Sequence, residues 1–233
     1  MLLALLSWAY LAWLAADMSS LVGGMAPRLR AWTPAEFVLV FLMWAIMMVA
    51  MMLPSAAPMI LLHARVQRQA GTAATHLATW TFTAGYLVAW SVFSLGATAL
   101  QWGLEKAALL SPMMVTTDHR LGAAVLAVAG GYQLTPLKHA CLEHCRSQLH
   151  FVSQHWRPGA GGALRMGLHH GAYCIGCCWF LMALLFVGGV MNLVWIAVIA
   201  GFVLVEKVAP HGRRVARASG VVLIVAALFL LTG

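Results

Sequence analysis

The sequence predicts an all-α, polytopic helical membrane protein with about seven transmembrane helices, forming a single bundle over residues 1–233. Of the 233 residues, 63% are hydrophobic and only 9% are charged, whereas a soluble domain is roughly half apolar and a quarter charged. The apolar residues also stand in continuous runs of about 15–20, the length of a membrane-crossing helix rather than an alternating barrel strand. Such a composition excludes a soluble enzyme and a nucleic-acid-binding domain.

Seven apolar stretches account for the predicted spans. They run over about Leu2–Val22, Glu36–Ile60, Thr79–Ala99, Leu121–Leu134, Leu168–Val187, Val190–Val205 and Val215–Leu231. The first resembles a signal peptide in length but lacks a preceding basic residue, so we expect a retained helix. Six spans remain if it is removed or interfacial. Gly188-Gly189 and Asn192 separate the fifth and sixth stretches, which predicts a tight helical hairpin.

The loop charges predict the orientation in a bacterial inner membrane. With seven spans, one side carries ten of the 14 Lys and Arg residues. These are Arg65, Arg68, Lys138, Arg146, Arg157, Arg165, Lys207, Arg213, Arg214 and Arg217; the other side carries Arg28, Arg30, Lys106 and Arg120. The richer side should be cytoplasmic, which places the N-terminus inside and the C-terminus outside. Glu206 and Lys207, at the end of the sixth span, are expected to reach solvent.

All five cysteines lie in two short segments that also contain histidines. The first segment holds Cys141, His144 and Cys145, within a polar stretch at about 135–166, and the second holds His170, Cys174, Cys177 and Cys178. Residues three or four apart share a helix face, so each segment should present its cysteines together. Because the fourth span ends and the fifth begins on the cytoplasmic side, the two segments should meet there.

Sulfur and imidazole ligands suit a soft or borderline metal ion, with copper(I) favoured and zinc or iron as alternatives. The Cys174–Cys177 pair is also a C-x-x-C motif, which would fit a membrane thiol-disulfide oxidoreductase. Haem bound by histidines is a further alternative, as is a structural subunit in which the cysteines only pack. No nucleotide-binding or hydrolase motif is present, so the pattern favours binding over catalysis.

The second apolar stretch carries a row of methionines. Met43, Met47 and Met51 are four residues apart, and Met48 and Met52 form a parallel row. Thioethers are uncharged ligands suited to copper(I), so Met47, Met48, Met51 and Met52 are candidate transfer ligands. Methionine is also an adaptable packing residue, and packing alone is the alternative interpretation.

Three sequence blocks resemble a bacterial family of predicted metal-binding integral membrane proteins of unknown function. The blocks are Met43–Pro54, Tyr132–Lys138 with the following Cys141 and Cys145, and His170–Trp179. The resemblance extends over about residues 44–207 and implies a helical membrane protein that binds metal, without naming the metal or a reaction.

The combined hypothesis is a membrane protein that transports, delivers or inserts copper. Its partners would be the lipid bilayer and metal-donor or metal-acceptor proteins, with no nucleic acid. The sequence does not predict an oligomeric state.

Overall fold

The computed structural model describes residues 2–21, 32–69, 75–111, 114–116 and 118–232. Within these ranges the chain is almost entirely helical and forms no strand, which confirms the predicted all-α class. The helices are α1 (Leu2–Leu21), α2 (Pro34–Gln69), α3 (Thr75–Lys106), α4 (His119–Leu134), α5 (Pro136–Arg146), α6 (Gln148–His155), α7 (Gly159–Ala183), α8 (Leu185–Gly188), α9 (Leu193–Val208) and α10 (Gly212–Thr232).

Four helical segments are long and apolar enough to cross a membrane, judged by length and composition. They are α2, α3, the continuous α7–α8 segment Gly159–Gly188, and α10. In α1 the side chains are described over Leu2–Ala16, and this stretch is apolar. Helices α4 and α9 have 16 residues each, a rise of about 24 Å against a hydrocarbon core of about 30 Å. Seven complete spans therefore remain a prediction.

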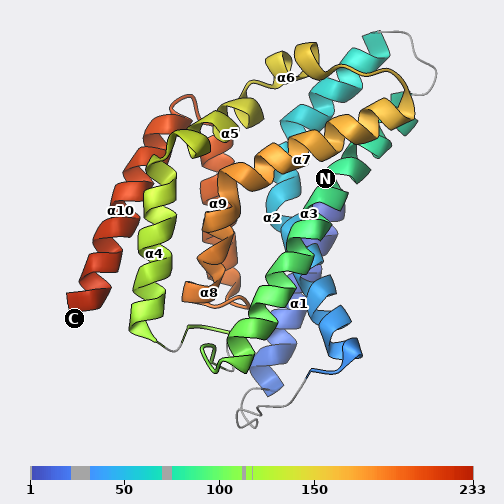
Figure 1. The fold of residues 1–233 in the computed structure, drawn as a ribbon. Helices are drawn as coiled ribbons and strands as arrows, with labels where there is room; N and C mark the ends of the chain where they lie inside the picture. Colours follow the sequence, from blue (N-terminus) through green and yellow to red (C-terminus); the bar gives the residue numbers. More distant parts are fainter. Residues whose placement is uncertain (1, 22–31, 70–74, 112–113, 117, 233) are drawn as a thin grey trace.

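The long helices share two ends, as Figure 1 shows. Helices α2, α4 and α9 finish, and α3 and α10 begin, at the upper end of the view, where α5 and α6 also lie. The predicted turn after α8 is present: Gly189 has a φ of 96°, a conformation that glycine adopts without steric cost. Asn192 then caps α9 by accepting a hydrogen bond from Trp195 N at 3.1 Å.

Helix α1 packs against α2 where a proline weakens the backbone of α2. Pro54 has no N–H, so the carbonyl of Ala50 loses its partner within the helix. The indole Nε1 of Trp8 donates to this carbonyl at 3.0 Å. An apolar helix thus supplies the hydrogen bond that proline removed.

The polar stretch between α4 and α7 is folded rather than a simple connector. Thr135 caps α5 by accepting from Lys138 N at 3.2 Å, and Pro136 occupies the first turn, where a missing N–H costs nothing. Helix α5 packs along α7 and turns one face inward; the buried residues are Lys138, His139, Leu142 and Cys145.

Two of the charges used to predict orientation are not loop charges. Lys138 is 0% exposed and Lys207 is 9% exposed. Glu206 is 1% exposed, so the expectation that Glu206 and Lys207 reach solvent was wrong. Eight of the ten positive charges on the predicted cytoplasmic side remain outside the core, while Arg28 and Arg30 lie outside the described residues.

We expect Gly85→Ala to lower the unfolding free energy by about 1–3 kcal/mol, because α3 and α7 touch through their backbones there. A Cβ at Gly85 would meet the Leu164 carbonyl and lie 2.9 Å from Leu168 N. Gly96, also on α3, has nothing within 4 Å, so Gly96→Ala serves as the matched control. Thermal unfolding in detergent measures both; equal stabilities would contradict this contact.

Candidate metal-binding site

Four thiols from two helices lie together in the interior. Helix α7 contributes Cys174, Cys177 and Cys178, which are 0–1% exposed, and α5 contributes Cys145, which is 5% exposed. The Sγ atoms of Cys177 and Cys145 are 3.9 Å apart. The two cysteine segments therefore lie side by side, as their positions in the chain predicted. We refer to these four residues as the thiol group.

The fifth cysteine lies at the edge of the thiol group. Cys141 is partly exposed, and its sulfur faces Gly176 on α7, where an added Cβ would lie 2.9 Å from Cys141 Sγ. Burial raises the pKa of the Cys141 thiol. Hydrogen bonds to Cys174 and Cys177, together with burial, raise the pKa of the Cys145 thiol well above its ordinary value. Both α5 cysteines are therefore protonated at neutral pH.

The methionine row of α2 reaches the thiol group through Met52. Met52 Sδ lies 3.9 Å from Cys178 Sγ. Met47, Met48 and Met51 are 0–1% exposed and belong to the same buried core. The row is thus internal, and Met52 is the member in contact with a cysteine.

A buried lysine faces the thiol group and was missed by the sequence reasoning. Lys207 Nζ lies 2.8 Å from Cys174 Sγ and donates to Ser55 Oγ at 3.1 Å. On the other side, Tyr86 Oη lies 3.1 Å from Cys174 Sγ and also donates to the Met52 carbonyl at 3.1 Å. Cys174 is therefore the sulfur with the most polar surroundings.

A second set of buried charged side chains, besides Lys207, is formed by Lys138 and Glu206. Lys138 Nζ pairs with Glu206 Oε2 at 2.8 Å and also donates to the Cys177 carbonyl. Gln133 Nε2 donates to the other carboxylate oxygen of Glu206 at 2.9 Å. The network joins α4, α5, α7 and α9, and it reaches the cysteines through the Cys177 carbonyl. The sequence contained a signal for this network, because ionisable residues inside apolar helices are functional candidates by default.

The two histidines predicted as ligands differ in position. His170 is 4% exposed, lies one turn before Cys174, and its Nδ1 has no hydrogen-bond partner among the described residues. His144 instead stacks on Tyr173, with ring centroids 4.4 Å apart, and its Nδ1 is 2.9 Å from the Ala140 carbonyl. His170 is therefore buried one helical turn from Cys174, whereas His144 is occupied by contacts with Tyr173 and the Ala140 carbonyl.

The side chains do not form a closed metal cage. In the described part of the chain, no three or more His, Cys, Asp or Glu side chains are grouped as a metal site. Cys178 Sγ and Cys177 Sγ instead donate to the Cys174 carbonyl at 2.8 and 3.2 Å. The sulfurs would have to turn toward a shared ion to bind it, so the ligand roles remain predictions.

Comparison of the sequence with known protein families identifies the family of this chain. The family model described as PpoB2, Copper chaperone, matches residues 41–230. The chain belongs to this copper chaperone family. The matched range includes the whole thiol group and the methionine row, and it leaves out α1. No curated protein and no solved structure matches the chain.

We expect Glu206→Gln to destabilise this copper chaperone family member by about 3–5 kcal/mol, since it leaves the Lys138 ammonium buried without its counter-charge. The control is Glu143→Gln, which breaks the exposed Glu143–Arg213 pair, whose side chains are 52% and 53% exposed. That pair contributes less than about 1 kcal/mol. Chemical or thermal unfolding in detergent measures the stability of both variants. Similar losses of stability would contradict the expectation that the buried pair matters more than the exposed one.

Proposed function

We propose that the protein is an integral membrane copper(I) chaperone that carries its cargo on the thiol group and exchanges it along the methionine row. One observation carries the proposal. Thiols from α5 and α7, the thioether of Met52 and the buried ammonium of Lys207 converge within contact distance in the interior. Membership of the copper chaperone family supports copper as the cargo.

The donor set favours copper(I) over the alternative metals. Thiolate and thioether ligands together select copper(I), and two or three sulfurs satisfy its coordination. A structural zinc ion instead requires four ligands arranged as a tetrahedron. The hydrogen bonds of Cys177 and Cys178 to a backbone carbonyl are weak enough to be exchanged for bonds to a metal.

Lys207 offers charge compensation for bound cargo. Two thiolates around one copper(I) ion carry a net charge of −1, which is costly to bury alone. The Lys207 ammonium, 2.8 Å from Cys174 Sγ, would balance that charge. The same interior would disfavour a metal complex with a net positive charge, because the Lys207 ammonium already lies there.

The surface supports membrane placement. Large apolar side chains are widely exposed on the outer helices; examples are Phe229 at 79%, Val194 at 74% and Val92 at 67%. Exposure of so much apolar surface to water is unfavourable, whereas its contact with lipid tails is not. We therefore propose residence in a bacterial inner membrane, with a cytoplasmic N-terminus and a C-terminus outside.

The burial of the C-x-x-C motif favours cargo binding over thiol-disulfide exchange. Exchange requires an attacking thiolate to reach a sulfur, and Cys174 and Cys177 are only 0–1% exposed. For haem, the ring of His170 already packs against Phe82, Tyr86 and Phe151, with centroids 5.4–6.2 Å away. These neighbours fill the space that a macrocycle would need.

Replacing Cys174, Cys177 and Cys178 together by Ser should weaken copper(I) binding by at least about tenfold, or 1.4 kcal/mol. His144→Ala should leave the affinity within about twofold, because its ring stacks on Tyr173 outside the thiol group. Competition with a colorimetric copper(I) chelator gives the affinity, and elemental analysis identifies the metal. Equal metal content in the triple variant and the wild type would overturn the proposal.

Met52→Leu should also lower the copper(I) affinity, by roughly threefold to tenfold, since it removes the thioether beside Cys178 while nearly conserving volume. Met59→Leu is the matched control: Met59 is equally buried on α2 but packs in a separate core around Phe82 and Phe151. The same chelator competition applies. If both substitutions have the same effect, Met52 acts in packing only.

A further inference from the structure

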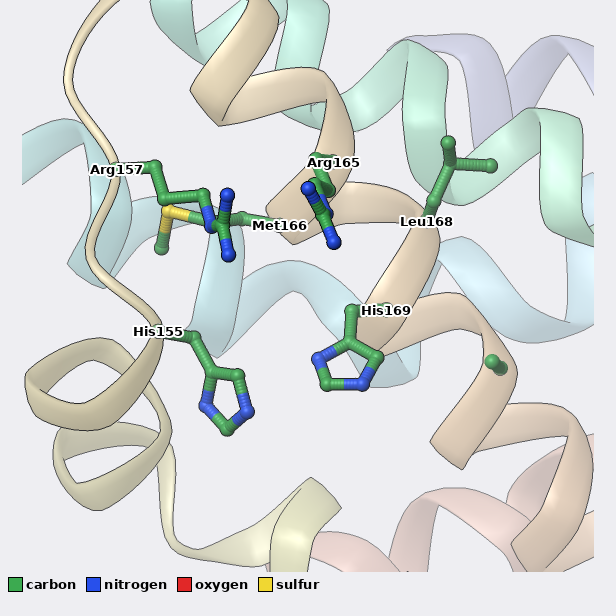
Figure 2. Close-up of a pocket in the computed structure, with 7 residues that line it drawn as sticks. His155, Arg157, Arg165, Met166, Leu168 and His169 are labelled. Carbon is green, nitrogen blue, oxygen red and sulfur yellow. The ribbon is translucent and has the colours of Figure 1, made fainter.

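A basic cavity lies beside α7, and none of the four cysteines lines it. It has a volume of about 310 Å³ and opens between the end of α6 and the first turns of α7 (Figure 2). His155 and Arg157 come from the segment before α7, and Arg165 and His169 come from α7 itself. Arg165 and His169 are four residues apart and so share one face of the helix. Figure 2 shows Arg157 and Arg165 in the upper part of the view, with Met166 between them, and His155 and His169 below.

The charge of this cavity is unbalanced. None of its lining residues is acidic, and no described carboxylate forms an ion pair with Arg157 or Arg165. Two guanidinium groups, which stay charged at all relevant pH values, would repel a free metal cation. They match the paired oxygens of a phosphate or carboxylate. The cavity therefore fits an anion, and the rings of His155 and His169, with centroids 4.7 Å apart, add hydrogen-bonding groups at its edge.

The position of the cavity identifies the source of the anion. Arg165 lies three residues before Leu168, the start of the predicted fifth span. Leu168 lines the cavity, and the side chains of Leu164 and Leu168 are 38% and 36% exposed on the same part of α7. An apolar surface next to a basic cavity at a membrane boundary matches a lipid, with tails on the leucines and headgroup on the arginines.

We propose that this cavity binds the phosphate headgroup of an anionic phospholipid. The proposal rests on the membrane placement proposed above but not on copper binding. Arg157 and Arg165 would hold the phosphate oxygens, and the exposed leucines would contact the acyl chains. The bound lipid would bridge α7 and the segment that precedes it.

The test is a titration of the full-length protein, in mild non-ionic detergent, with phosphatidylglycerol and with phosphatidylcholine, counting bound lipids by native mass spectrometry. Wild-type protein should prefer phosphatidylglycerol. The double variant Arg157→Gln/Arg165→Gln should bind it about 30-fold more weakly, since each basic residue contributes about fivefold. Arg214→Gln, which removes an exposed arginine on α10 from the same predicted side, should retain the wild-type affinity.

Three results would overturn the proposal. The first is an unchanged phosphatidylglycerol affinity in the double Gln variant, and the second is an equal loss in Arg214→Gln. In the third, inorganic phosphate binds in an Arg157- and Arg165-dependent way while neither lipid is preferred, which would make the occupant a free phosphate. The variant Arg157→Lys/Arg165→Lys keeps the charge but lacks the paired donors, so it should lose less affinity than the Gln variant.

Copper(I) affinity measured on the same samples separates the two proposals. It should be the same in the wild type and in the double Gln variant, because the cavity and the thiol group share no side chain. A normal copper affinity without lipid selectivity refutes the lipid site alone. Lipid selectivity without copper binding refutes the copper function alone.

Discussion

The opposite charges of Glu206 and Lys207, at the end of α9, are the constraint on which the arrangement of this end of the bundle depends. Adjacent residues on a helix point about 100° apart, so Glu206 and Lys207 enter two different neighbourhoods. Glu206 meets Lys138 of α5, and Lys207 meets Cys174 of α7. Arg146 of α5 closes the arrangement by donating to the Glu206 carbonyl at 2.7 Å, which satisfies the exposed end of α9. Helices α5, α7 and α9 therefore hold one another in a fixed register.

Buried charges such as these contribute little to the stability of the fold, but they can form part of a binding site. A buried ion pair often contributes less than well-packed apolar residues of the same size. Lys207 is the more demanding case, because its nearest neighbours are the Cys174 thiol and the Ser55 hydroxyl rather than a carboxylate. A cation kept in such a place has a purpose if negative charge develops beside it. In the proposed function, two thiols that lose their protons on binding one copper(I) ion would leave a net charge of −1 beside Lys207.

The sequence was sufficient for the helical class and for the meeting of the two cysteine segments, because both follow from apolar run length and from chain topology. Periodicity also placed Cys174, Cys177 and Cys178 on one face. It could not place Lys207, since hydropathy treats a charge at the end of an apolar run as solvated, and Ser55 is 152 residues away in the chain. The spacing also predicted that His144 lies on the flank of Cys141 and Cys145, and its ring stacks on Tyr173 while Cys145 is buried; its role as a ligand stays a prediction.

The close contacts along α7 decide how a cargo ion can be exchanged. Gly85 and Gly167 bring α3 and α7 into backbone contact, with a Cβ at Gly167 3.1 Å from Tyr86 N, so α7 cannot slide or tilt without separating the two backbones. The thiols of Cys177 and Cys178, by contrast, each donate one hydrogen bond to a backbone carbonyl, that of Cys174. Rotation about χ1 releases them at the cost of about one such bond each, roughly 1 kcal/mol. If the proposed copper site is correct, loading would proceed by rotation of cysteine side chains within a rigid bundle, and unloading would cost no more than the same rotations.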